Sequence, residues 1–305
     1  MTQRVLVTGA GGFIGRPAVA ELVRRGFEVH AVSRREPPQP AADEVTWHAV
    51  DLLDAAARGR LVAGVRASHL LHLAWYAEPG AFWNARENAA WVAASIGLVD
   101  EFARAGGARA ALAGTCAEYD WEAPQPLSED APLSPSTYYG TCKDATRRVV
   151  EGLAERSGVS LAWGRIFFLY GPREDERRLV ASVARALAAG ERAQTSAGTQ
   201  RRDFLHVDDV AAAFAAILAS SVEGPVNVAS GESVTVRSIA ERLADAADRR
   251  NLLDVGPLPD RAGDPAEICA DVARLRDEVR FTPAWSLADG LADAARWWAD
   301  QPATR

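Results

Sequence analysis

The first 24 residues run from a short apolar segment through three spaced glycines into an amphipathic pattern. Residues 5–7 are apolar and predict a short buried strand. From residue 13 onward apolar residues recur at helical spacing, around and after Gly9, Gly12 and Gly15. A strand, a tight turn and a helix bring free backbone N–H groups and the positive end of a helix dipole to one point. That arrangement suits a dinucleotide pyrophosphate; a glycine-rich loop capping an ordinary strand–helix unit is the alternative.

Each of the three glycines has its own role in such a turn. Gly9 permits the tight turn, Gly12 lets the backbone approach a phosphate, and Gly15 lets the helix pack on the strand. Phe13 and Ile14 lie between the last two glycines and complete the turn predicted to bind the cofactor. Because the turn follows the first strand and precedes a helix, cofactor binding is favoured over the capping alternative.

Composition excludes several classes of protein. The net charge is −7 and no dense block of Lys and Arg occurs, which argues against nucleic-acid binding. No apolar run approaches the ~20 residues that cross a bilayer. The three cysteines are odd in number and lack a CxxC spacing, so neither a disulfide framework nor a zinc site is indicated. With the first strand starting within four residues of the N-terminus, a signal peptide is not expected, and a cytoplasmic, metal-free protein is predicted.

Strands and helices alternate through the first half of the chain. This alternation predicts an α/β fold: a doubly wound parallel sheet of the Rossmann type, covered by helices on both faces. Residues 1–172 are expected to form this dinucleotide-binding domain, with 203–222 packing back on it. Residues 173–202 and 223–305 are expected to form a smaller mixed α/β domain for the substrate. Strands are predicted at 28–33, 45–50, 69–74, 110–114 and 161–169, and a long helix at 84–105.

A tyrosine and a lysine four residues apart follow the fifth predicted strand. On a helix, Tyr139 and Lys143 share one face, and an ammonium near a phenol lowers its pKa, which makes the phenol usable in proton transfer. Thr115, at the end of the fifth strand, can supply a hydroxyl to the same place. Taken alone the Tyr-x-x-x-Lys spacing is weak, since a solvated helix face produces it as well.

In combination these features resemble the extended short-chain dehydrogenase/reductase family of nucleotide-sugar epimerases, dehydratases and reductases. Residues 8–15 match the opening turn of the family and 202–210 its pattern in the second half. The resemblance implies that Thr115, Tyr139 and Lys143 are catalytic and that Tyr139 and Lys143 also contact the cofactor. It further implies a homodimer. The remaining cofactor contacts that it implies are Asp51 and Leu52 near the adenine and Leu73 and Ala74 beneath the cofactor.

The end of the second strand bears on the choice of cofactor. An NAD site usually has an acid there to bind the ribose 2′-hydroxyl. This chain has Ser33, Arg34 and Arg35 instead. A hydroxyl and two guanidinium groups favour a 2′-phosphate, so NADP is predicted, with NAD less favoured. A solvated basic turn is the alternative interpretation.

Departures from the family pattern reduce the number of reactions that the sequence favours. Dehydratases of the family carry an acid two residues before the tyrosine aligned with Tyr119, but Ala117 stands there and Glu118 comes one residue late. Dehydration is therefore disfavoured. We expect an NADP-dependent reductase acting on a keto group of a nucleotide-activated deoxysugar, with Tyr139 as proton donor. A nucleotide-sugar epimerase with tightly bound NAD(P) and a non-catalytic NADP-binding sensor are the alternatives.

The sequence defines the substrate-binding site less clearly than the cofactor-binding site. Phe168 stands where the family usually has an asparagine that binds the substrate pyrophosphate, and Trp91 replaces another asparagine. Aromatic side chains near the site either stack on a sugar or base or belong to the core. Arg202 is a candidate for a substrate phosphate or for a structural ion pair beside Asp203. The predicted substrate contacts are Trp75, Cys116, Ala117, Phe168, Arg173 and Arg202. His206 with Asp208 and Asp209 is interpreted as a helix start with Asp at the N-cap, not as a metal site.

Overall fold

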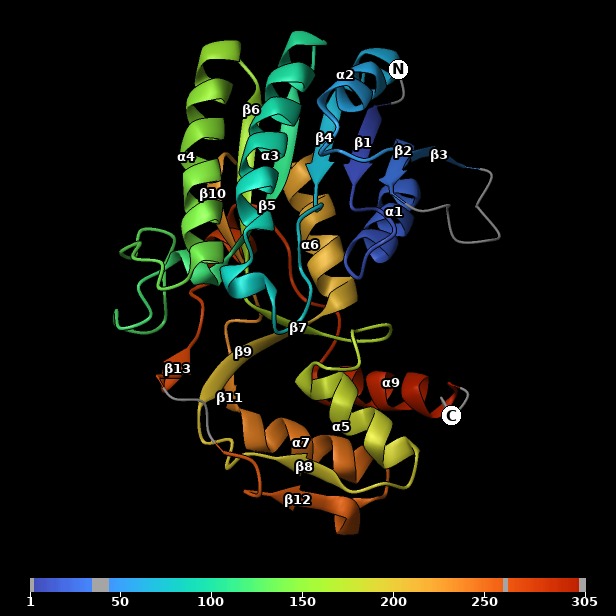
Figure 1. The fold of residues 1–305 in the computed structure, drawn as a ribbon, viewed down its shortest axis with the longest axis vertical. Helices are drawn as coiled ribbons and strands as arrows, with labels where there is room; N and C mark the ends of the chain where they lie inside the picture. Colours follow the sequence, from blue (N-terminus) through green and yellow to red (C-terminus); the bar gives the residue numbers. More distant parts are fainter. Residues whose placement is uncertain (1–2, 35–43, 260–262, 302–305) are drawn as a thin grey trace.

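The computed structural model describes residues 3–34, 44–259 and 263–301. Its larger part is a seven-stranded sheet in the order β10-β6-β5-β4-β1-β2-β3, with every neighbouring pair parallel (Figure 1). The strand order reverses between β1 and β4, which is where a doubly wound sheet opens a crevice at its carboxyl edge. The strands are β1 Arg4–Thr8, β2 Glu28–Ser33, β3 Val45–Ala49, β4 His69–His72, β5 Arg109–Thr115, β6 Ser160–Ile166 and β10 Gly224–Val228.

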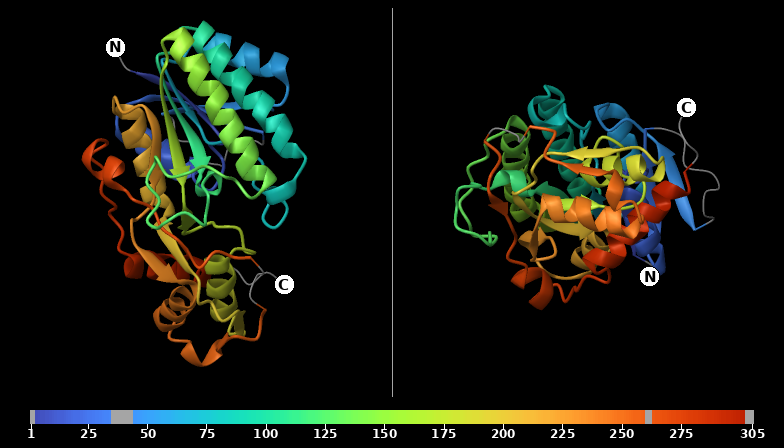
Figure 2. Two further views of the ribbon diagram at one scale, coloured as in Figure 1. Left: turned by 90° about the vertical axis from the view of Figure 1, so that its left-hand side faces the viewer. Right: turned by 90° about the horizontal axis from the view of Figure 1, so that it is seen from below.

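Helices cover both faces of this sheet (Figure 2). On one face lie α2 (Ala55–Val65), α3 (Glu87–Arg104) and α4 (Tyr138–Ser157), and on the other α1 (Gly15–Arg24) and α6 (Val207–Ala219). The side chains of successive residues of β1 pack in different hydrophobic cores, because strand side chains alternate between the two faces of a sheet. Val5 and Val7 pack with α1 and α6, whereas Leu6 packs with α2 and α3.

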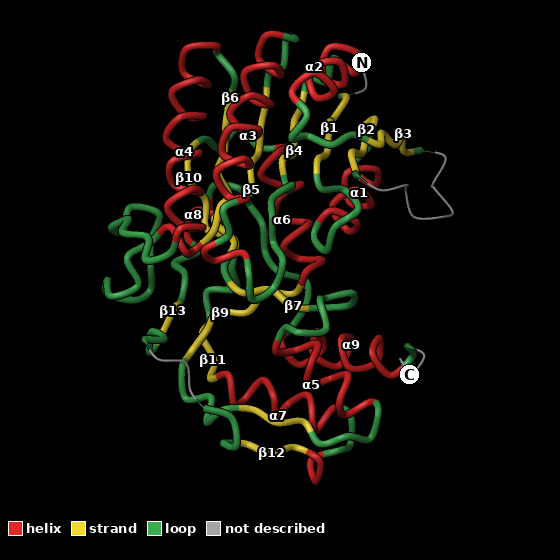
Figure 3. The backbone as a smooth tube through the Cα atoms, viewed as in Figure 1, coloured by secondary structure: helices red, strands yellow, loops and turns green. Residues whose placement is uncertain are grey.

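A smaller layer lies beyond the carboxyl edge of the sheet (Figure 3). Its central strand, β9 (Arg201–His206), pairs in parallel with β7 (Phe168–Tyr170) and β13 (Glu267–Ile268) and antiparallel with β11 (Ser233–Thr235). A parallel pair, β8 with β12, and three packed helices complete this layer. The remaining elements are α5 Leu179–Ala188, α7 Val236–Ala246, α8 Ala273–Asp277, α9 Leu287–Ala299, β8 Ala193–Thr195, β12 Leu253–Val255, η1 Phe82–Asn84, η2 Cys116–Glu118 and η3 Arg250–Leu252.

The predicted fold class is confirmed, with local corrections. The strand predicted at 161–169 is two strands: β5 ends at Thr115, opposite Ile166, and beyond that point the chain pairs with β9 instead. The segment 224–228, expected in the second domain, is the edge strand β10 of the large sheet. The first helix begins at Gly15 and not at residue 13. In the part of the chain that the structure describes, no helix is long and apolar enough to cross a membrane.

Candidate active site

The glycine turn joins β1 to α1 at the carboxyl edge of the sheet. Gly9 has a φ of +69°, which favours glycine, and a Cβ on it would lie 2.8 Å from the backbone nitrogen of Ala74. Gly12 N–H donates to the Gly9 carbonyl at 2.9 Å. A Cβ on Gly15 would overlap that same carbonyl oxygen, so the helix can approach the turn only with glycine there. The turn therefore has the close backbone packing that a pyrophosphate-binding loop requires.

The other predicted cofactor contacts lie along the same edge. Phe13 and Ile14 are in the turn itself, and the Ser33 side chain lies against Gly11, where a Cβ would be 3.1 Å from its hydroxyl oxygen. Arg34 is exposed just after β2, while Arg35 lies outside the described residues. Ser33 thus borders the turn at the point where a ribose substituent is expected.

Two further pairs of residues follow β3 and β4. Asp51 is exposed, and its carboxylate accepts the Leu53 N–H at 3.0 Å, while Leu52 is buried. Leu73 and Ala74 are half-buried and lie beside β1, where Leu73 N–H donates to the Thr8 carbonyl at 3.2 Å. Together with the glycine turn these residues form a cradle that fits a dinucleotide cofactor.

Tyr139 and Thr115 come together where α4 begins. The Thr137 hydroxyl caps the helix by accepting Gly140 N–H at 3.1 Å. A Cβ on Gly140 would overlap the Ala117 carbonyl, so glycine allows α4 to start against η2. This contact brings the Tyr139 phenol close to the Thr115 side chain. Burial raises the pKa of Tyr139, and the Thr115 hydroxyl opposes that rise.

Lys143 lies one helical turn after Tyr139, and it is the only lysine in the chain: the other 33 of the 34 Lys and Arg residues are arginine. It is buried, and Nζ donates to the Ala113 carbonyl at 2.8 Å. Nζ also lies 3.9 Å from the centroid of the Trp75 ring and 6.0 Å from that of Tyr139. Burial lowers the pKa of Lys143 to about 7. The predicted sharing of one helix face by Tyr139 and Lys143 is therefore present.

Aromatic rings surround the Tyr139 side chain. Trp75, Phe82 and Trp83 each meet it edge-on, with ring centroids 5.0–6.4 Å apart. The Trp75 indole N–H donates to Asn88 Oδ1 at 2.8 Å, and the Asn88 amide in turn donates to the carbonyls of Phe82, which begins η1, and Ala85, which follows it. The role of Asn88 was not predicted from the sequence. The signal that could have identified it is a polar residue on the buried face at the start of α3. Asn88 holds the indole in place beside Tyr139.

The predicted substrate contacts fall into two groups. Cys116 and Ala117 are buried in η2, directly after Thr115, and burial raises the pKa of the Cys116 thiol to about 12. Phe168 and Arg202 meet across the small sheet, with the guanidinium carbon 5.5 Å from the ring centroid. Arg173 is exposed, with a φ of +71°.

The ion pair considered for Arg202 exists with a different partner. Arg202 is buried and its guanidinium lies 2.6 Å from Asp264, not beside Asp203. The Asp203 carboxylate instead accepts N–H groups of Ser230 and of two later residues. The interpretation of the helix start is also corrected: His206 and not an aspartate is the N-cap of α6, because its Nδ1 accepts Asp208 N–H at 3.3 Å.

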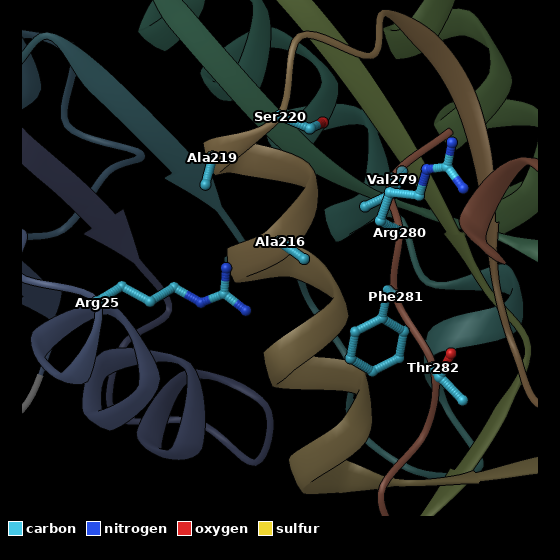
Figure 4. A pocket seen from close by; sticks show the side chains of 8 residues that line it. All are labelled: Arg25, Ala216, Ala219, Ser220, Val279, Arg280, Phe281 and Thr282. Atoms are coloured by element: carbon cyan, nitrogen blue, oxygen red, sulfur yellow. The ribbon is translucent and has the colours of Figure 1, made fainter. Parts of the chain in front are cut away.

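Two cavities lie away from Thr115, Tyr139 and Lys143. One of about 380 Å³ includes Arg25, Ser220 and Arg280 (Figure 4). It adjoins the carboxyl ends of α1 and α6, whereas the glycine turn lies at the opposite end of α1. Another of about 330 Å³ lies beside β9 and includes His206 and Trp285. Neither contains Thr115, Tyr139 or Lys143. Within 3–34, 44–259 and 263–301, no three His, Cys, Asp or Glu side chains are grouped as a metal ion would need.

Comparison with known proteins identifies the family. Residues 5–229 match the model of the NAD dependent epimerase/dehydratase family. A UDP-glucose 4-epimerase of Corynebacterium glutamicum is 25% identical, over 95% of this chain and 97% of its own. A dTDP-6-deoxy-L-talose 4-dehydrogenase (NAD(P)(+)) of Kitasatospora kifunensis is 29% identical, over 95% and 94%.

Solved structures agree with this. MoeE5 in complex with UDP-glucuronic acid and NAD has a TM-score of 0.83 and 30% identity, covering 96% of this chain and 98% of that one. The UDP-glucose 4-epimerase of Thermotoga maritima has a TM-score of 0.88 at 23% identity, covering 97% and 98% of the two chains, which is a likeness of fold. The predicted resemblance is confirmed: the chain belongs to the NAD-dependent epimerase/dehydratase family of extended short-chain dehydrogenase/reductase enzymes.

Proposed function

We propose that this enzyme is a nucleotide-sugar epimerase, which oxidises one sugar carbon and reduces it again with a retained NAD-type cofactor. The observation that carries the proposal is the convergence of Thr115, Tyr139 and Lys143 beside the cradle formed around the glycine turn. A non-catalytic sensor has no need of these three groups together. The relatives that are epimerases, at 25% identity over nearly the whole chain, support the same reaction.

The side chains divide the work in the following way. The nicotinamide, when bound, supplies the acceptor and donor of hydride. Tyr139, as the phenolate, takes the proton of the sugar hydroxyl during oxidation and, as the phenol, returns it during reduction. Thr115, whose hydroxyl lies close to the phenol, orients that sugar hydroxyl. Lys143, in its ammonium form, stabilises the phenolate form of Tyr139 that accepts this proton, which offsets the effect of burial on the phenol pKa.

The position of Glu118 argues against dehydration. Dehydration needs a carboxylic acid that faces the sugar, but Glu118 is fully buried and lies 2.9 Å from the Arg165 guanidinium. Its neighbours Cys116 and Ala117 carry no acid. The chain therefore retains the residues for hydride transfer, whereas in the described turn η2 no acid is placed for elimination.

Net reduction of a keto sugar, the reaction expected from the sequence, is the second candidate. It uses the same three side chains, and the 29% identical 4-dehydrogenase favours it. The matched epimerases outnumber that relative, so epimerisation takes first place. The preference for NADP stays a prediction that rests on Ser33, beside the glycine turn, and on Arg34, exposed just after β2. Replacing Arg34 and Arg35 by Ala should then raise the KM for NADPH far more than that for NADH.

The proposed substrates are UDP- or dTDP-linked hexoses, by analogy with the relatives. The purified enzyme is incubated with UDP-glucose, UDP-glucuronic acid and dTDP-linked 6-deoxy and 4-keto sugars, with NAD or NADP added. Products are separated by chromatography while absorbance at the nicotinamide band is followed. Interconversion of epimers without net change of absorbance supports the epimerase. Stoichiometric consumption of NADPH or NADH with a keto sugar, and no epimer formed, would replace it by the reductase.

We also propose a homodimer built through α3 and α4, which lie side by side on the outside of the large sheet (Figure 1). Val149 on α4 is 46% exposed, whereas Val150 beside it is buried. Light scattering should give twice the 32.6 kDa mass of one chain. Val149→Glu should shift this value toward the monomer; a monomeric wild type would contradict the proposal.

A further inference from the structure

Glu118 lies behind the three proposed catalytic residues. It is the last residue of η2, the short turn that follows β5, and Thr115 precedes that turn. The chain turns back there so that the Glu118 carboxylate accepts the Thr115 N–H at 2.9 Å, while the Thr115 hydroxyl accepts Ala117 N–H at 3.2 Å. This reciprocal capping fixes the backbone of Thr115 and so the place of its hydroxyl.

The carboxylate is enclosed by hydrogen-bond donors. Trp163 Nε1–H lies 2.9 Å and 3.1 Å from the two oxygens, and Arg165 Nε–H donates at 2.9 Å. Gly114 makes room for this indole, because a Cβ there would overlap it. Glu118 is fully buried, and burial raises its pKa, while the Arg165 guanidinium and the Trp163 and Thr115 N–H groups oppose that rise. A protonated carboxyl would need an acceptor for its hydrogen, and these partners are all donors, so the donor set favours the ionised form of Glu118.

Lys143 faces the same buried region from α4. The Trp163 ring, whose N–H binds Glu118, lies 6.0 Å from Lys143 Nζ. Of the ionisable groups around Lys143, His72 on β4 is held neutral, because burial lowers its pKa to about 3. Before reaction Tyr139 is a neutral phenol, because burial raises its pKa, and Asp144, next on α4, is paired with Arg147 and Arg148. Glu118 supplies the negative charge that favours the ammonium form of Lys143, with Arg165 behind it.

We propose that Glu118 is a positioning residue for the proposed reaction: through the backbone it fixes Thr115, and through its charge it keeps Lys143 in the ammonium form. The inference rests on the proposed function, since it assigns a role to the residues that perform it. A carboxylic acid that faced the sugar could perform elimination. Glu118 lies behind the site instead and acts on the proposed catalytic residues from there. Lys143 needs this support because burial acts against its charge.

The test uses the single lysine of the chain. Protein grown with lysine labelled with ¹³C at Cε gives one lysine signal, so the protonation of Lys143 is read directly by NMR in the cofactor-free protein. In Glu118→Gln the side chain keeps nearly its shape but loses its charge. We expect the titration midpoint of Lys143 to fall by roughly one pH unit. Glu129→Gln is the matched control: this carboxylate is also partly buried and accepts a backbone N–H, from Asn227, but does not act on Lys143, and the midpoint should stay unchanged.

The outcomes separate this inference from the proposed function. An unchanged midpoint in folded Glu118→Gln would overturn the inference, whatever the enzyme turns over. A lowered midpoint supports it even if no epimer is formed, in which case only the proposed function fails. If Glu118→Gln does not fold, Glu118→Gln with Arg165→Met removes both charges together, and the midpoint is again expected below that of the wild type. In assays with substrate, kcat should fall as the pH rises and Lys143 loses its proton. In Glu118→Gln this fall should begin at a lower pH than in the wild type, and acidification should restore kcat. Glu118→Asp should restore the wild-type pH profile.

Discussion

At the scale of single residues, the role of the Tyr139 phenol is the most direct prediction. Tyr139→Phe removes the hydroxyl that exchanges the proton and leaves the ring among Trp75, Phe82 and Trp83. The turnover number should fall by about 10²–10⁴-fold. Cofactor affinity, measured by quenching of tryptophan fluorescence, should change little. Tyr138→Phe is the control, because Tyr138 is 41% exposed and should retain activity; equal losses in both variants would disprove the assignment.

Lys143 should also make the stability of the protein depend on pH. Its pKa is about 7 in the folded protein and about 10.5 in an unfolded chain. Between these values the unfolded chain binds more protons, so the free energy of unfolding rises with pH from about 7 to 10. Lys143→Met removes the cost of burying the ammonium and should stabilise the protein by about 2–4 kcal/mol at pH 6–7 while abolishing activity.

This gain should shrink as the pH rises toward 10.5, because the wild-type lysine is neutral in both states only above that value. The measurement is urea unfolding of both proteins at pH 6.5, 8 and 9.5. A stability difference that stays constant with pH would contradict a depressed pKa for Lys143.

The sequence predicted the residues whose positions follow from local spacing. Tyr139 and Lys143 are one helical turn apart, and Thr115 ends a strand. To predict that the three residues come together, it was enough to identify that helix and that strand. Residues that depend on distant partners were missed or misassigned. Asp264 pairs with Arg202 from 62 positions away, and Asn88 binds the indole of Trp75 from another element. No local pattern encodes contacts of that range.

At the scale of elements, the glycine turn makes a prediction about packing. In Gly15→Ala the new Cβ would overlap the Gly9 carbonyl and the backbone of Ala10, so α1 must move away from the turn. We expect a loss of about 1–3 kcal/mol of stability, together with much weaker cofactor binding. Urea unfolding and titration with NADH would measure both effects.

Gly152 offers a matched control within a helix. It lies in α4, and nothing lies within 4 Å of where its Cβ would be. Gly152→Ala should therefore stabilise the protein by about 0.5–1 kcal/mol and leave cofactor affinity unchanged. If Gly15→Ala behaved in the same way, the close approach of helix to turn would not be a requirement of the site.

The sequence predicted the bounds of a strand where that strand pairs with the same neighbouring strands along its whole length. The second strand, 28–33, was predicted with its observed bounds because it pairs along its whole length between β1 and β3. The segment 161–169 gave no sign of its division, since apolar residues continue on both sides of Ile166 and only the change of partner there separates the two strands. Likewise α2 was not anticipated, because its alanine-rich sequence has little contrast between its faces.

At the scale of the whole molecule, the two sheets are joined through β9 and the loops that follow neighbouring strands. Asp203 on β9 is fully buried and accepts hydrogen bonds from Ser230 N–H at 2.8 Å and Gly231 N–H at 2.9 Å, just after β10 of the large sheet. It also accepts Ala270 N–H at 3.2 Å, just after β13. This carboxylate therefore holds together three segments that are distant in sequence, beside the strand that carries Arg202.

Asp203→Asn should destabilise the whole molecule. The amide group would turn donors toward backbone N–H groups that are donors themselves, and buried groups would lose their charged acceptor. We expect a loss of about 2–4 kcal/mol in urea unfolding, in a single transition if both sheets unfold together. Asp208→Asn is the control, because the Asp208 side chain is 51% exposed and its replacement should change stability by less than about 0.5 kcal/mol. Loss of the small sheet alone, seen as a separate early transition, would contradict a cooperative joining of the two sheets at Asp203.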